Sequence, residues 1–124
     1  MNRTQVIAYT GSTDRQLQNW TETSLLRLPA PVKHKREWPT TELLFARAAV
    51  LLGTKGVTLF VIRRIADQVR PQLRMVALLD GREPFYVAAT SERVLVTLLP
   101  DRIAEWSAQQ MEPVAVVVVE WPKN

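Results

Sequence analysis

The sequence predicts an α+β protein, with four helices in residues 1–71 and a small sheet of three or four strands with one helix in residues 72–124. Apolar residues recur at helical spacing as far as Val69, and apolar runs rich in β-branched residues follow Leu73. The charge divides near the same place. Residues 1–74 hold 12 Lys and Arg against 5 Asp and Glu, whereas residues 75–124 hold 4 against 7. We therefore expect two parts with different tasks.

The composition limits the class of protein. A chain of 124 residues has room for one ordinary domain, or for two very small ones that share a core. It contains no Cys, which excludes disulfides, thiolate metal sites and a Cys nucleophile, and which fits a reducing compartment. We find neither an apolar stretch of the roughly 18 residues that span a membrane nor a secretory signal. We expect a cytoplasmic protein with no membrane partner.

Two short helices are predicted at the start of the chain. Thr4 can cap a first helix that runs through Tyr9, and Gly11 stands where a helix usually stops. The segment that follows, from Thr13 to Gln16, has the form of a capping box, in which each of these two side chains bonds the backbone N–H of the other. This pattern predicts a second helix from Asp14, separated from the first by a tight turn.

The second predicted helix has two distinct faces. Leu17 and Trp20 are three residues apart and share an apolar face, which predicts that they pack inward. The opposite face is polar and consists of Arg15, Gln18, Asn19 and Glu22. Two helices joined by a Gly-Ser-Thr turn are a candidate helix-turn-helix.

Residues 27–39 carry three of the eight prolines, which forbids a helix there and favours an extended, exposed loop. This loop also carries the basic cluster Lys33, His34, Lys35 and Arg36. Taken alone, a cluster of this size is more often a solvated loop than a binding site. Beside a helix-turn-helix, it predicts a basic hairpin or wing.

Two longer helices are predicted next. The third runs from Leu43 to about Leu52. The fourth is capped by Thr58 and closed by Pro71. Its apolar stripe consists of Leu59, Ile62, Ile65, Ala66 and Val69. The residues expected to lie outside the stripe are Arg63, Arg64, Asp67 and Arg70.

Four apolar runs suggest strands in the remainder of the chain, and they are residues 75–79, 85–89, 94–99 and 114–121. A helix is expected from Pro100 until before Pro113. The last run is an almost uninterrupted series of Val residues. Such a run is typical of a strand buried on both faces, so we expect it to be central in the sheet or to lie at a subunit interface.

Residues 4–70 resemble the winged helix-turn-helix DNA-binding domain of the MerR family of bacterial transcription regulators. The resemblance rests on residues at fixed offsets, which are Thr10, Gly11, Arg15, Leu17, Trp20, Leu25, Leu26, Arg36, Trp38, Glu42, Leu43, Gly56, Thr58, Leu59 and Ile62. The chain departs from the family's pattern at three positions, with Ile7 where the family usually has Ala, Gln18 where it commonly has Arg, and Ser24 where Gly precedes the Leu-Leu pair. Beyond residue 70 the resemblance ends, because the family continues into a long coiled-coil helix.

The resemblance implies which residues bind double-stranded DNA. The second helix would enter the major groove with Thr13, Arg15, Gln16, Gln18 and Asn19. The wing would contact phosphates with Lys33, His34, Lys35 and Arg36. No catalytic residues, no metal ligands and no cofactor site are predicted, and we do not expect an enzyme.

We therefore expect a transcription regulator that binds double-stranded DNA as a homodimer, because one such domain reads a single half-site. The second half of the chain, 72–124, is expected to form the dimer or to hold an effector, and the sequence does not say whether a small-molecule effector exists. Two alternatives stay open. One is an architectural DNA-binding protein of a phage or mobile element, of the excisionase or packaging type. The other is a protein-interaction module whose basic half docks an acidic partner.

Overall fold

The computed structural model describes residues 1–33, 36–79 and 82–123, and in them the chain folds into five helices and one three-stranded antiparallel sheet. The α+β class predicted from the sequence is confirmed. The elements in chain order are α1 (Arg3–Thr10), α2 (Asp14–Glu22), α3 (Thr40–Thr54), α4 (Leu59–Ala77), β1 (Phe85–Ala89), β2 (Val94–Thr97), α5 (Pro100–Ala108) and β3 (Ala115–Val119).

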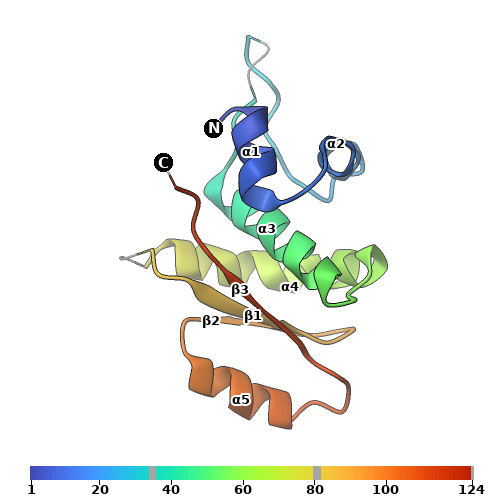
Figure 1. The fold of residues 1–124 in the computed structure, drawn as a ribbon, viewed down its shortest axis with the longest axis vertical. Helices are drawn as coiled ribbons and strands as arrows, with labels where there is room; N and C mark the ends of the chain where they lie inside the picture. The colour runs from blue at the N-terminus through green and yellow to red at the C-terminus, as the bar shows by residue number, and fades with distance from the viewer. Residues whose placement is uncertain (34–35, 80–81, 124) are drawn as a thin grey trace.

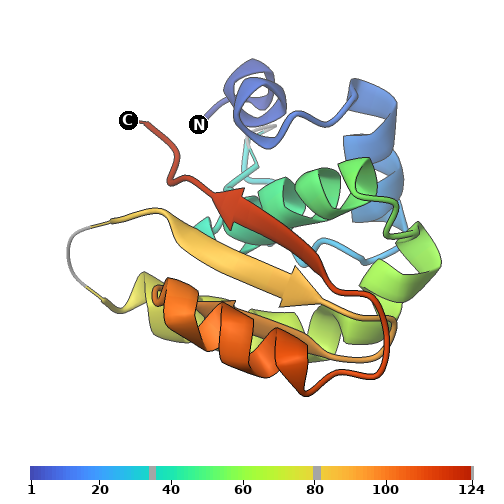
Figure 2. The ribbon, with the colours of Figure 1, turned by 60° about the horizontal axis from the view of Figure 1, so that its bottom comes forward.

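The elements form layers (Figure 1). The sheet lies between α5 on one face and the pair α3 and α4 on the other, with α4 packed on β2 and α3 packed on β3. Figure 2 shows α5 in front of the sheet and the two long helices behind it. α1 packs on α3. Together with α2 and the loop residues 23–33 and 36–39, α1 makes up the end of the molecule that is farthest from α5.

The sheet has the order β2-β1-β3, with both pairs antiparallel. Alternate residues of β1, such as Phe85 and Val87, are fully buried on the face toward α3 and α4, and Val117 lies opposite Val87 in β3. The strand predicted from the last apolar run is confirmed. Of its two expected positions, the one in the centre of the sheet is wrong, and the one at a subunit interface stays a prediction. The hairpin to β2 and the return of the chain after α5 place a neighbour on each side of β1, which makes β3 an edge strand.

The predicted end of the fourth helix at Pro71 is wrong, because α4 continues through this proline to Ala77. A proline inside a helix costs about 3 kcal/mol. The extension buries Leu73 and Val76 on the same stripe as Val69, and each such side chain contributes about 1.5–3 kcal/mol. The burial therefore outweighs the cost, and the strand predicted for residues 75–79 is replaced by the last helical turn.

One hydrophobic core serves both predicted parts of the chain. The continuous cluster of buried residues includes Leu17 and Leu44 from the first part and Phe85 and Val119 from the second. α4 crosses the predicted boundary at residue 71 without interruption.

Arg70 was expected on the polar face of α4, but it is buried, with an exposed fraction of only 2%. It forms an ion pair with Glu42 of α3, which is also buried, with 2.9 Å between Arg70 Nη2 and Glu42 Oε1 and 3.1 Å between Arg70 Nε and Glu42 Oε2. The guanidinium also lies 4.5 Å from the centre of the Phe45 ring. A buried charge is tolerated only when it is paired and hydrogen-bonded, and both conditions hold here.

The same ion pair fixes the chain where it leaves α2. Arg70 Nη2 donates to the carbonyl of Leu25, and Glu42 Oε1 accepts from the backbone N–H of Arg27 at 2.7 Å. α3 and α4 thus hold the first residues of the loop that leads into the basic cluster.

α1 is capped by Asn2 rather than by the predicted Thr4, through a capping box with Gln5. Its Tyr9 hydroxyl donates to the carbonyl of Glu120, just beyond β3, at 2.5 Å. Burial raises the pKa of Tyr9 well above its usual range, so the hydroxyl stays protonated as a donor. This bond connects the first helix to the last strand.

Candidate nucleic-acid interface

The turn between α1 and α2 is built around Gly11. Its φ of +76° lies in the left-handed region, and its N–H bonds the carbonyl of Ile7 at 3.0 Å. The residues on either side of it, Thr10 and Ser12, are both buried, and their hydroxyls are 2.8 Å apart and share a hydrogen bond. The turn is therefore short and fixed on both sides.

We expect Gly11→Ala to lower the free energy of unfolding by about 1–2 kcal/mol, the cost of an L residue in left-handed conformation. An added Cβ would also lie 3.1 Å from Arg47 Nη1. Gly53→Ala is the matched control: Gly53 lies inside α3 with nothing within 4 Å of an added Cβ, so this change should leave stability unchanged or raise it. Urea unfolding of the two variants measures both effects. Equal stabilities would contradict this account of the turn.

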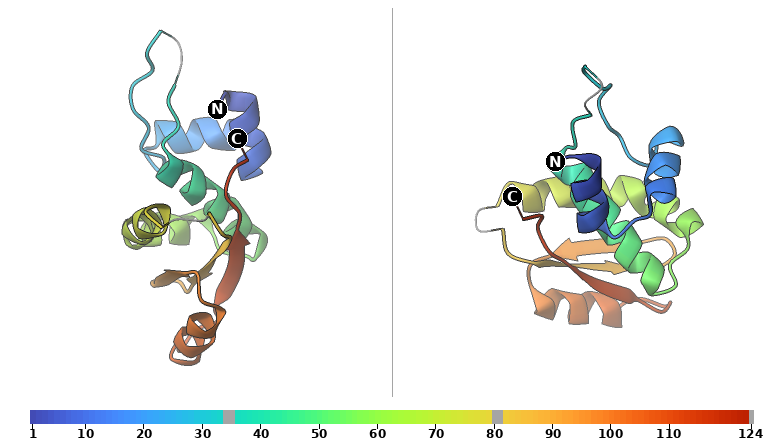
Figure 3. Two further views of the ribbon diagram at one scale, coloured as in Figure 1. Left: turned by 90° about the vertical axis from the view of Figure 1, so that its left-hand side faces the viewer. Right: turned by 45° about the horizontal axis from the view of Figure 1, so that its top comes forward.

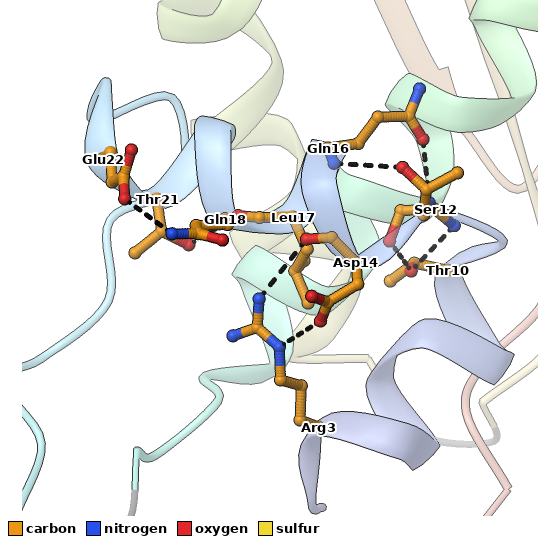
Figure 4. A network of polar contacts seen from close by, with 10 residues as sticks. Arg3, Thr10, Ser12, Asp14, Gln16, Leu17, Gln18, Thr21 and Glu22 are labelled. Carbon is orange, nitrogen blue, oxygen red and sulfur yellow. Dashed lines mark hydrogen bonds and ion pairs between the residues drawn. The ribbon is translucent and has the colours of Figure 1, made fainter.

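The predicted capping box at the start of α2 is confirmed. The backbone N–H of Gln16 donates to Thr13 Oγ1 at 3.0 Å, and Gln16 Oε1 accepts from the backbone N–H of Thr13 at 2.9 Å (Figure 4). Arg3 of α1 adds a contact across the turn, with its Nε 2.5 Å from Asp14 Oδ1. Thr13 and Gln16 therefore hold the start of the helix, and the Gln16 oxygen is already in use.

The two faces of α2 are arranged as predicted. Leu17 and Trp20 are buried, whereas Arg15, Gln18 and Asn19 are exposed. Gln18 Nε2 donates to Glu22 Oε1 at 3.0 Å, so its amide is engaged along the helix (Figure 4). Among the described residues, the Arg15 and Asn19 side chains make no hydrogen bond, which leaves their donors available to a ligand.

Arg15 and Asn19 border an open groove of about 610 Å³ between α2, the end of α3 and the start of α4. The opposite wall is apolar and includes Val50, Val57 and Ile62. The groove lies beside the exposed face of α2, so a ligand that contacts this face also meets the wall formed by α3 and α4.

Residues 23–33 and 36–39, the described parts of the loop, project from the same end of the molecule as α2 (Figure 3). Within it, Lys33 is exposed, and Arg36 is half-buried with its Nη1 3.4 Å from the carbonyl of Pro29. His34 and Lys35 lie outside the described residues. Ser24, at the start of the loop, has a φ of +62°, a conformation that glycine adopts without strain.

Two arginines near α2 were missed as site residues. Arg63 of α4 donates from Nη2 to Thr23 Oγ1, just after α2, at 2.6 Å. Arg27 forms an exposed ion pair with Asp67 of α4, with 3.0 Å between Nη2 and Oδ1. The sequence places Arg63 on the polar face of a helix 40 residues from Thr23, and no local signal indicates their contact. Arg63 therefore adds positive charge at the end of α2.

Comparison of the chain with protein-family models, with curated proteins and with solved structures gives no match. None of the helices in the described segments is both long and apolar enough to cross a membrane. In the same segments, no group of three His, Asp or Glu side chains is placed to hold a metal ion.

Proposed function

We propose that the protein binds double-stranded DNA through α2 and the adjoining basic loop, acts as a homodimer, and regulates transcription. One observation carries this proposal. α2 follows α1 across a fixed turn and presents Arg15 and Asn19, whose donors have no partner among the described residues. It lies at the end of the molecule that also carries the basic loop residues Lys33 and Arg36.

The side chains on this face suit the edges of base pairs. Arg can bond both O6 and N7 of guanine, and Asn can bond both N6 and N7 of adenine in the major groove. The groove admits a helix, and helix-turn-helix proteins insert the N-terminal part of their second helix. Arg15 and Asn19 lie four residues apart on α2 and therefore on one side of it. Gln18 could also bond a base if its side-chain amide exchanges the hydrogen bond to Glu22 for one to the DNA.

The loop and the neighbouring arginines supply contacts that do not depend on sequence. Lys33 and Arg36 lie in the loop, and Arg63 lies beside the end of α2. Each Lys or Arg that neutralises a phosphate releases a condensed counterion, so binding should weaken steeply as salt rises. Arg36 has one bond to Pro29, which leaves its other donors for a phosphate.

The test of this proposal is the binding of a labelled duplex of random sequence at several salt concentrations. For a DNA-binding protein, the logarithm of the association constant should fall linearly with the logarithm of the salt concentration. Binding that is absent at low salt would contradict both the regulator and the architectural alternative, and would favour a module that docks an acidic protein. A footprint that overlaps a promoter would favour the regulator over an architectural protein.

Lys33→Ala should weaken binding to all DNA sequences equally and reduce the salt slope by about one, because a lost phosphate contact carries no sequence information. Arg102→Ala is the matched control, since it removes one positive charge from α5 at the far end of the molecule. Fluorescence anisotropy with two unrelated duplexes measures both variants. A change in preferred sequence on Lys33→Ala, or an equal effect of Arg102→Ala, would contradict this role.

A further inference from the structure

The two edges of the sheet differ in what covers them. At the β2 edge, the side-chain amide of Gln72 from α4 donates to the carbonyl of Val94 at 3.1 Å and accepts from the N–H of Val96 at 2.8 Å. Gln68 donates to the carbonyl of Glu92 at 2.7 Å, just before the strand. α4 thus occupies the backbone groups to which another strand would bond, and this edge is closed.

The bonds of Gln72 also show which way the backbone of β3 faces. In an antiparallel pair, the N–H and C=O of successive residues point alternately toward one neighbour and the other. The backbone N–H of Val96 points outward to Gln72, away from β1. Val87, the partner of Val96 in β1, therefore directs its own N–H and C=O toward β3, where it pairs with Val117. Consequently the backbone groups of Val116 and Val118 point toward the outer edge of β3.

The β3 edge is open. Among the described residues, no group bonds the outward N–H or C=O of Val116 or Val118. The next outward carbonyl, that of Glu120, is taken by the Tyr9 hydroxyl, so the open stretch ends there. The Val118 side chain, on the face that carries α5, is 47% exposed. An open, apolar edge is a template for another strand.

We propose that a second copy of this chain occupies the β3 edge, so that two β3 strands pair antiparallel about Val117. The two sheets then join into one continuous sheet, with Val116 of each copy opposite Val118 of the other. This strand pairing would hold together the homodimer of the proposed function. It rests on the proposed function only in taking the protein to be a homodimer, and not in any contact with DNA.

Three features favour a second copy over another partner. The pairing is self-complementary, as a two-fold dimer requires, because Val116 and Val118 are symmetric about Val117. The strand itself carries no charge, so nothing in it repels its own copy. The charges at its ends are opposite: Glu120 follows β3, and Lys55 borders a hollow with Val114 and Val116 at its start. Antiparallel pairing brings Glu120 of each copy toward Lys55 of the other.

Val118→Lys tests this edge directly. Because the two copies are related by a two-fold axis, the substitution occurs twice in the dimer and replaces two apolar contacts between Val118 and Val116. The dissociation constant of the dimer should therefore rise at least about tenfold. Leu78→Lys is the matched control, because Leu78 is 79% exposed in a separate apolar patch with Met75 and Leu79 at the end of α4. Sedimentation of the full chain without DNA measures the effect, and circular dichroism checks that both variants are folded.

Cross-linking tests the register. The chain has no Cys, so Val116→Cys and Val118→Cys each introduce one thiol. Directly opposed residues have Cα atoms about 5.5 Å apart, within the range of a disulfide. A mixture of the two variants should form a disulfide-linked dimer on oxidation faster than either variant alone.

A monomer at micromolar concentration, or a dimer lost on Leu78→Lys and kept on Val118→Lys, would overturn the inference. Failure of the mixture to cross-link faster than the single variants would overturn it as well. All these measurements omit DNA, so they separate failure of the dimer from failure of DNA binding.

Discussion

Glu42→Ala is expected to lower the free energy of unfolding by about 3–5 kcal/mol, because it leaves the charge of Arg70 buried without a counterion. The substitution also removes the acceptor of the Arg27 N–H, which anchors the loop after α2. Such a loss is a large share of the roughly 5–15 kcal/mol by which a domain of this size is stable.

Urea unfolding measures this effect, and Asp67→Ala is the matched control. Asp67 also pairs with an arginine, Arg27, but it is exposed, and exposed pairs contribute about 0–1 kcal/mol. Glu42→Gln keeps an acceptor for the Arg27 N–H while removing the charge, so its loss should be smaller than that of Glu42→Ala. Equal effects of Glu42→Ala and Asp67→Ala would show that the buried pair does not hold α3, α4 and the loop together.

Arg15→Ala is expected to reduce discrimination between the preferred base pair and its alternatives at one position by about 1–3 kcal/mol, which is roughly 5- to 150-fold in affinity. Asn19→Ala should do the same at a different position. Both side chains are exposed and make no hydrogen bond among the described residues, so their loss should leave the fold intact.

Competition assays that vary one base pair at a time measure this discrimination. Arg102→Ala on α5 is again the control and should leave the preference unchanged. An Arg15→Ala variant that loses affinity equally for every sequence would show that Arg15 contacts a phosphate, and that α2 positions the protein without reading bases.

Local signals were sufficient for several features that depend on neighbours in sequence, although the cap of α1 proved to be Asn2 and not Thr4. The capping box of Thr13 and Gln16, the Gly11 turn and the burial of Leu17 and Trp20 were all predicted, because a cap or one face of a helix is decided within a few residues. Residues 85–89 were predicted as a strand with the bounds that β1 has.

The predictions failed where distant residues decide. Arg70 was placed on a polar face because its counterion, Glu42, is 28 residues away. Pro71 was taken as a helix end because the burial of Leu73 and Val76 depends on the sheet that forms later in the chain. The last apolar run was expected in the centre of the sheet or at a subunit interface. It forms an edge strand instead of a central one, with its inward residues against α3 and Val118 partly exposed.

The most direct test of the central claim, that α2 reads DNA sequence, is selection of bound sequences from random duplex DNA by the full chain at physiological salt. The account predicts enrichment of an inverted repeat whose half-sites are about 10–10.5 base pairs apart, or a multiple of that spacing. It also predicts that Arg15→Ala changes the enriched bases. A pool without enriched sequence, or one that Arg15→Ala leaves unchanged, would contradict it.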